Sequence, residues 1–193
     1  RDVLFINVGV SIVKASSANT GGVITSSYEI CAAMLLSEDE FFENKETIVN
    51  EVLEKVRGLA KMEAVLLFRE FEDYYVGSSL PEVSQIISHC INTTTDALTE
   101  ALDTLTETDR ESLLPLFRAH LPKTMADIAV DRLHDRVPDQ YIKNAIASCL
   151  ASKIVYKEGT KFIASVPPKR LAAMALKYIA NEKEVATLME TVR

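Results

Sequence analysis

The sequence V-G-V-S-I-V-K-A-S-S-A-N-T-G-G-V-I-T-S-S-Y-E-I-C-A-A-M-L-L, residues 8–36, has the pattern of a strand, a polar turn and a helix. The strand is predicted from a short β-branched run, formed by Val8, Val10, Ile12 and Val13. Residues 15–22 are small or polar and end in Gly21-Gly22, which predicts a turn. From Val23 the apolar residues recur at helical spacing. Because open α/β sheets bind ligands at the carboxyl end of a strand that is followed by a helix, we expect a binding site here.

The predicted turn has residues suited to a small anionic ligand. Gly21 and Gly22 have no Cβ atom, so a ligand can approach the main chain, and the first N–H groups of the next helix attract carboxylates. Val23 and Ser26 are three residues apart, which places an apolar wall beside a hydroxyl. Asn19 can both donate and accept a hydrogen bond. The alternative interpretation is structural: the glycines only turn the chain, and Ser26 only caps the backbone.

The segment N-T-G-G-V-I-T-S, residues 19–26, resembles the N-A-G-G-V-x-x-S segment of the glutamate, leucine, phenylalanine and valine dehydrogenases. The longer run at residues 14–30 and the L-L-S-E-D-E-F-F run at 35–42 are most similar to the large NAD-specific glutamate dehydrogenases. The departures from those enzymes are Ala15, where an acidic residue is common, and Thr20, where Lys is common. Residues 136–153 resemble the C-terminal end of the same family, less specifically.

The resemblance implies a parent enzyme that oxidatively deaminates glutamate to 2-oxoglutarate with NAD. By position, Asn19, Gly21 and Gly22 are implied to lie by the cofactor. Val23 and Ser26 are implied to line the pocket for the side-chain carboxylate of the substrate. The catalytic Lys and Asp of the family belong to segments that precede this one, so no catalytic residue is assigned here. We therefore expect this chain to be inactive alone and to work with the rest of its own polypeptide, in a homo-oligomer of the parent.

Several signatures of complete enzymes are missing from the chain. The sequence contains no G-x-G-x-x-G dinucleotide fingerprint, no phosphate-binding P-loop and no G-x-S-x-G nucleophile motif. The chain begins at Arg1 and enters an apolar run at once, which favours a piece of a longer polypeptide. The alternative function is a non-catalytic helical module for assembly or regulation, in which the Gly-Gly turn is only structural.

Charge and composition exclude some classes of function. The net charge of the 193-residue chain is −7, from −12 in residues 1–112 and +5 in residues 113–193. An acidic chain without a basic stripe is a poor ligand for nucleic acid. The basic part could dock on the acidic part, although a solvated helical surface is the simpler interpretation. With no membrane-length apolar run and no signal peptide, we expect an intracellular protein, in the cytoplasm or the mitochondrial matrix.

The cysteines and histidines do not predict a metal site. Cys31, Cys90 and Cys149 each sit in an apolar helical pattern, which is typical of reduced, buried thiols. The histidines, at positions 89, 120 and 134, show no ligand spacing with cysteines or carboxylates.

Beyond residue 36 the sequence predicts helices almost throughout. Capping boxes begin at Ser37 and Ser79, and Gly58 is expected to bend or end the first of these helices. Both faces of the helix after Val23 are apolar, so it is expected to be covered on most sides. The predicted fold is mainly α: a strand–turn–helix remnant of a Rossmann-like dinucleotide-binding domain at 1–36, followed by a multi-helix C-terminal domain at 37–193. A sub-boundary is predicted near residues 77–79.

Overall fold

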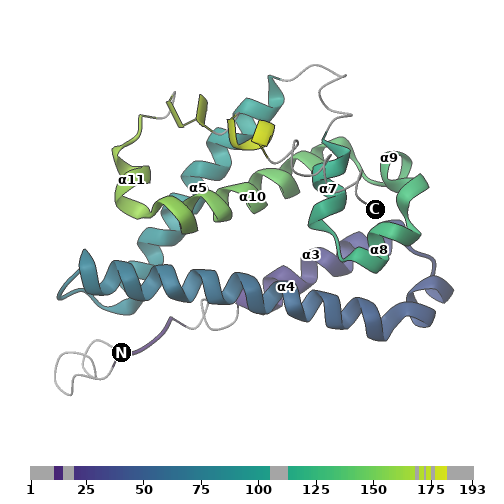
Figure 1. Ribbon diagram of the computed structural model, residues 1–193, viewed down its shortest axis with the longest axis horizontal. Coiled ribbons are helices and arrows are strands. Elements are labelled where there is room, and N and C mark those ends of the chain that lie inside the picture. Colours follow the sequence, from purple (N-terminus) through teal and green to yellow (C-terminus); the bar gives the residue numbers. More distant parts are fainter. Residues whose placement is uncertain are drawn as a thin grey trace.

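The computed structural model describes residues 11–14, 20–104, 113–167, 170–171, 173–174 and 177–181, and its regular structure there is helical (Figure 1). The helices are α3 (Thr20–Leu35), α4 (Glu38–Asp73), α5 (Leu80–Asp103), α7 (Leu114–His120), α8 (Lys123–Ile128), the 3-10 helix η1 (Val130–Arg132), α9 (Leu133–Arg136), α10 (Asp139–Glu158) and α11 (Thr160–Ser165). The prediction of a mainly α fold is confirmed.

The predicted strand and turn are not seen in the described residues. Val8 and Val10 lie outside them, and residues 11–14 have no regular secondary structure. Gly21 and Gly22 are helical, within the first turn of α3, so the prediction of a turn at these two residues was wrong. The physical reason is packing: a Cβ atom on Gly21 would lie 3.2 Å from Cγ1 of Val56, so the glycine lets α3 approach α4 closely. Asn19 lies outside the described residues.

Helix α4 is one continuous helix of 36 residues, where the sequence had predicted a bend or an end at Gly58. Its capping box is formed as predicted, with Ser37 and Glu40 each accepting from the backbone of the other. Gly58 faces open space and keeps helical geometry, because one glycine costs a helix only about 1 kcal/mol. Buried residues before and after Gly58 stabilise the helix across this position. They are Ile48, Val52, Leu66, Leu67 and Glu70.

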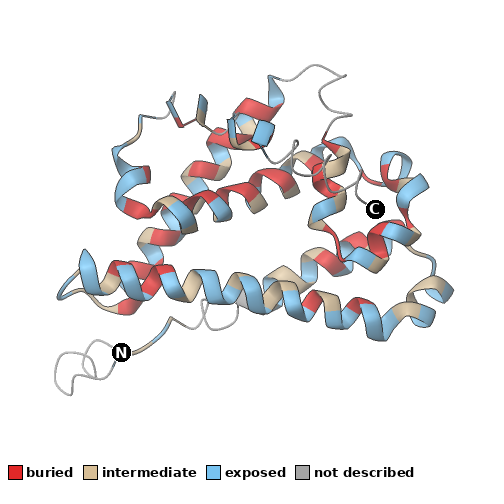
Figure 2. Cartoon of the chain, in the orientation of Figure 1, coloured by how far each residue is buried: buried red, intermediate tan, exposed pale blue. Residues whose placement is uncertain are grey.

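Helices α5 and α10 form the main helix pair of the core, and α11 packs against both. Figure 2 shows their buried residues facing one another across the upper part of the molecule. Gly77, with φ of 92°, lies in the turn between α4 and α5, and Gly159, with φ of 86°, ends α10. The break near Gly77 was predicted from the sequence. Residues 154–156 are part of α10.

Carboxylates on α4 and α5 join the acidic part of the chain to the basic part. Glu40 accepts two hydrogen bonds from the guanidinium of Arg132, at 2.8 and 3.0 Å, which lowers the pKa of Glu40 to about 2. Asp103 pairs with Lys143 at 2.6 Å. These two ion pairs join the oppositely charged parts within one chain.

The described cysteines are all free, with Cys31 and Cys90 buried and Cys149 half-buried. Of the helices that the structure describes, none combines the length and the apolar character needed to cross a membrane.

Candidate ligand-facing surface of helix α3

Helix α3 has one packed face and one open face. On the packed face, Tyr28, Cys31 and Leu35 are between 1% and 3% exposed. On the opposite face, Val23 is 76% exposed and Ile30 is 50% exposed. The expectation that this helix is covered on most sides is therefore wrong for the described part of the chain, although the outer face is as apolar as the sequence indicated. We call the outer residues, Val23, Ser26, Ile30 and Ala33, the α3 outer face.

The outer face carries a hydroxyl that differs from its two neighbours. The Thr25 hydroxyl donates to the carbonyl of Gly21 at 2.7 Å, and the Ser27 hydroxyl donates to the carbonyl of Ile24, also at 2.7 Å. The Ser26 hydroxyl makes no hydrogen bond to another described residue, and its side chain is exposed. Of these three consecutive hydroxyls, Ser26 is thus the one free to bind a ligand, and it lies on the same face as Val23.

A layer of polar aromatic residues holds α3 to the helices beneath it. The Tyr141 hydroxyl donates to the carbonyl of Ser27 at 3.2 Å and lies 3.5 Å from the Cys31 thiol. The Tyr28 hydroxyl donates to the carbonyl of His120 at 3.4 Å, and the two rings lie 5.3 Å apart. Sequence reasoning missed this layer, because its partners lie 92 to 114 residues apart along the chain.

Burial keeps the groups of this layer uncharged at neutral pH. The pKa of His120 falls to about 4, chiefly through burial and further through the nearby Lys55 and Lys153. Burial raises the pKa of Tyr28 to about 12 and raises the pKa of the Cys31 thiol. A neutral imidazole and protonated hydroxyl and thiol groups position α3 but provide no activated nucleophile. The layer is therefore an anchor that orients the outer face.

The structure brings together part of the predicted site. Val23 and Ser26 share the outer face, as their spacing indicated, and Gly22 is exposed at the start of the same helix. Gly21 instead faces α4, beside Val56. The position of Asn19 relative to them stays a prediction, since it lies outside the described residues.

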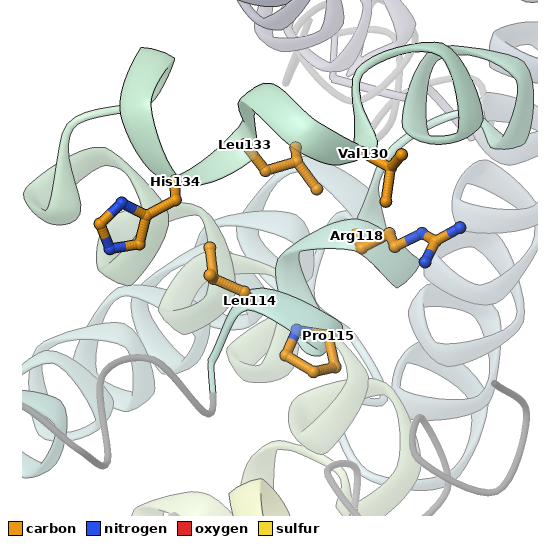
Figure 3. Close-up of a pocket in the computed structure, with 6 residues that line it drawn as sticks. All are labelled: Leu114, Pro115, Arg118, Val130, Leu133 and His134. Atoms are coloured by element: carbon orange, nitrogen blue, oxygen red, sulfur yellow. The ribbon is translucent and has the colours of Figure 1, made fainter. Parts of the chain in front are cut away.

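A separate shallow pocket lies between α7 and the η1–α9 segment (Figure 3). It is lined mainly by apolar groups, from Leu114, Pro115, Arg118, Val130, Leu133 and His134. The Arg118 guanidinium is directed toward Asp127, 3.1 Å away. Sequence analysis did not predict this pocket. Within the described ranges, no three His, Cys, Asp or Glu side chains come close enough to hold a metal ion.

The curated relatives of this chain are glutamate dehydrogenases. The chain is 32% identical over 164 residues to "Glutamate dehydrogenase 2" of Dictyostelium discoideum, a match that covers 78% of this chain. It is 29% identical to the "NAD-specific glutamate dehydrogenase" of Neurospora crassa, over 79% of this chain, and 27% identical to that of Saccharomyces cerevisiae, over 78%. The chain spans about 15% of the length of each of these relatives.

No family model matches the chain, and no solved structure matches it significantly. The relatives confirm the resemblance that residues 14–42 indicated. This chain is thus similar to one section of the large NAD-specific glutamate dehydrogenases.

Proposed function

We propose that this chain is the C-terminal section of an NAD-dependent glutamate dehydrogenase, in which the α3 outer face forms one wall of the pocket for substrate and cofactor. The parent converts glutamate to 2-oxoglutarate, and NAD, when bound, accepts the hydride. Residues 1–36 complete the dinucleotide-binding domain, and residues 37–193 form a helical domain behind it. The proposal is supported by relatives that are named for this activity.

One observation carries the proposal: an apolar helix face that includes a free hydroxyl is left open beside a well-packed core. Val23 is 76% exposed, although its helix is anchored on the opposite face by Tyr28 and Cys31. Exposed Val and Ile on an anchored helix indicate a surface that another part of the parent covers. In this arrangement the Ser26 hydroxyl donates to the distal carboxylate of glutamate, and Val23 contacts its methylene groups.

The cofactor side of the wall belongs to the residues at the start of α3. Gly22 is exposed and has no Cβ atom, so a flat cofactor ring can approach its backbone. In the proposal, Asn19 also lies on this side, with its amide orienting the cofactor, whereas Gly21 lets the start of α3 pack closely on α4 beside Val56. The catalytic acid–base groups come from the rest of the parent polypeptide, and the chain alone is inactive.

The alternative, a non-catalytic module for assembly, is favoured by a different observation. Helix α4 also exposes apolar side chains along its outer side, Phe42 being 61% exposed. An assembly surface on α4 would in itself be compatible with the proposed pocket wall, since the two faces belong to different helices.

The proposed function is tested in the full-length parent by replacing Ser26 with Ala. Losing a hydrogen bond to a charged group costs about 1.5–3 kcal/mol, which corresponds to roughly a tenfold to a hundredfold rise in the KM for glutamate. The matched control is Ser27→Ala, because among the described residues that hydroxyl bonds to the carbonyl of Ile24 alone. Asn19→Ala should instead weaken the binding of NAD. A folded Ser26→Ala enzyme with unchanged KM and kcat/KM for glutamate would refute the assignment.

A further inference from the structure

Four exposed apolar residues form a line along the outer side of α4. They are Phe42 (61% exposed), Val49 (43%), Leu53 (41%) and the exposed Ala60. Their spacings of seven, four and seven residues keep them within about 40° of arc on a helix of 3.6 residues per turn. The four residues occupy positions of a coiled-coil seam, in which one helix packs lengthwise against another, and Glu46 and the half-buried Val56 occupy the two seam positions between them. We call these four residues the α4 stripe; in Figure 2 the outer side of α4 is largely exposed.

We propose that the α4 stripe binds the α4 stripe of a second copy of this chain, with the two helices antiparallel around a twofold axis level with residue 51. A twofold interface requires a self-complementary surface, so the order of the residues along the stripe is decisive. When the order is reversed on the partner, Phe42 lies opposite Ala60, and Val49 lies opposite Leu53. The largest side chain of the stripe thus meets the smallest, and the two of intermediate size meet each other.

Charged residues beside the stripe complement one another in the same arrangement. Glu43 follows Phe42, and Arg57 precedes Ala60 by one helical turn; both side chains are exposed. Helices paired about residue 51 place Glu43 of each copy near Arg57 of the other, so that two opposite-charge pairs flank the stripe.

A parallel arrangement lacks both kinds of complementarity. It would place Phe42 against Phe42 and Ala60 against Ala60, pairing large with large and small with small. It would also bring Glu43 of one helix near Glu38 of the other, and like charges at flanking positions oppose pairing. The antiparallel arrangement is therefore the one that this sequence supports.

The interface concerns the helical domain alone and does not depend on the proposed enzymatic function. The stripe lies on α4, whereas Val23 and Ser26 lie on the outer face of α3. A failure of the interface would leave the glutamate site untouched, and a failure of the Ser26→Ala test would leave the dimer untouched.

The first test is the mass of this chain in solution across a concentration series, measured by sedimentation equilibrium. We expect a concentration-dependent dimer whose dissociation constant rises at least tenfold in Leu53→Glu. The matched control is Val65→Glu, since Val65 is 58% exposed on the same helix but points away from the stripe. Far-UV circular dichroism verifies that both variants are folded. A monomer at every concentration, or equal weakening by the two variants, would overturn the proposal.

The second test determines the orientation of the helices. Glu43→Arg should weaken the dimer about tenfold, and adding Arg57→Glu to the same chain should restore it, because the two charges then exchange places. Mixing Glu43→Cys chains with Arg57→Cys chains under mild oxidation should give a disulfide between unlike chains. A dimer that the charge exchange does not restore, or disulfides only between like chains, would overturn the antiparallel pairing.

Discussion

The buried carboxylate of Glu70 on α4 accepts hydrogen bonds from both the backbone N–H and the hydroxyl of Thr160, the first residue of α11. Glu70 is 1% exposed and Thr160 is fully buried. The Tyr75 hydroxyl lies 3.0 Å from the Thr160 hydroxyl, and the Arg69 guanidinium lies 3.7 Å from the Glu70 carboxylate. A helix N-terminus has unpaired N–H groups, so the carboxylate stabilises α11 while fixing the end of α4 to it.

We expect Gly159→Ala to destabilise the protein more than Gly77→Ala does. Both glycines have φ near 90°, a conformation that costs a residue with a Cβ atom about 1–2 kcal/mol. At Gly159 the added Cβ would also lie 2.8 Å from a carboxylate oxygen of Glu70, whereas at Gly77 it meets nothing within 4 Å. The measurement is the free energy of unfolding in urea.

Two effects act in the same direction at Gly159: its backbone, with φ of 86° and ψ of 164°, lies in a region essentially restricted to glycine, and the added Cβ would meet Glu70. Equal losses of stability in the two variants would show that neither effect adds to the cost at Gly159.

Gly58→Ala should stabilise the chain by about 0.5–1 kcal/mol, because alanine loses less backbone entropy than glycine within a helix. The position lies inside α4, is exposed, and has open space where the Cβ would be. Gly21→Ala serves as the comparison and should increase the stability less, since its Cβ would lie 3.2 Å from Cγ1 of Val56. Thermal unfolding measures both, and a lower melting temperature for Gly58→Ala would contradict a continuous α4.

The stability of the chain should fall as the pH is lowered from about 6.5 to about 4, through His120. Its pKa is about 4 in the folded protein and 6.5 when unperturbed, so in this window only the unfolded chain takes up the proton. The stabilisation is complete above pH 6.5 and is lost toward pH 4, by about 2–3 kcal/mol in total.

Urea unfolding at several pH values checks this, with His120→Gln expected to flatten the profile between pH 6.5 and 4. His134→Gln is the control, because His134 is exposed and pairs only with the neighbouring Asp135 among the described residues. A His120→Gln profile as steep as that of the parent chain would assign the pH dependence to other groups.

Glu51→Gln should destabilise the protein by roughly 1 kcal/mol, the usual net value of a lost charge-assisted hydrogen bond at a half-exposed position. Glu51 accepts from the Thr124 backbone N–H at 2.9 Å and from the Thr124 hydroxyl at 2.8 Å, at the start of α8. Glu54→Gln, on an exposed part of the same helix, should change the stability of the protein little. Chemical denaturation of both variants distinguishes them, and equal effects would exclude a specific role for Glu51.

Local signals in the sequence predicted most of the helical structure. Ser37 and Ser79 start helices through capping boxes, and Gly77 and Gly159 interrupt them, because these effects act within a few residues. Gly58 was misjudged because the cost of one glycine in a helix is small beside the burial on either side of it. The contacts of Glu51 and Glu70 with other helices could not be predicted, since nothing local marks a carboxylate as the partner of a distant helix terminus.

The geometry of the candidate site was predictable in part, and its chemistry stays a prediction. Helical spacing placed Val23 and Ser26 on one face, and the structure confirms this. The Gly21-Gly22 pair was misread as a turn, because glycine also permits close helix packing, and only the neighbouring Val56 shows which role applies. The anchor of Tyr28 and Tyr141 beneath the site depends on tertiary contacts that no short motif encodes.

Three carboxylates of α4, Glu40, Glu51 and Glu70, contact later parts of the chain, which has a consequence for synthesis on the ribosome. Their partners follow 73, 90 and 92 residues later in the chain. At the usual elongation rate, α4 therefore waits roughly 4–18 s before the residues that complete its packing emerge. During that interval α3 is already present to pack against α4, but the surface of α4 that contacts α5 and α8 is uncovered, so the nascent chain is exposed to aggregation and to chaperone capture while α5 to α10 are being made.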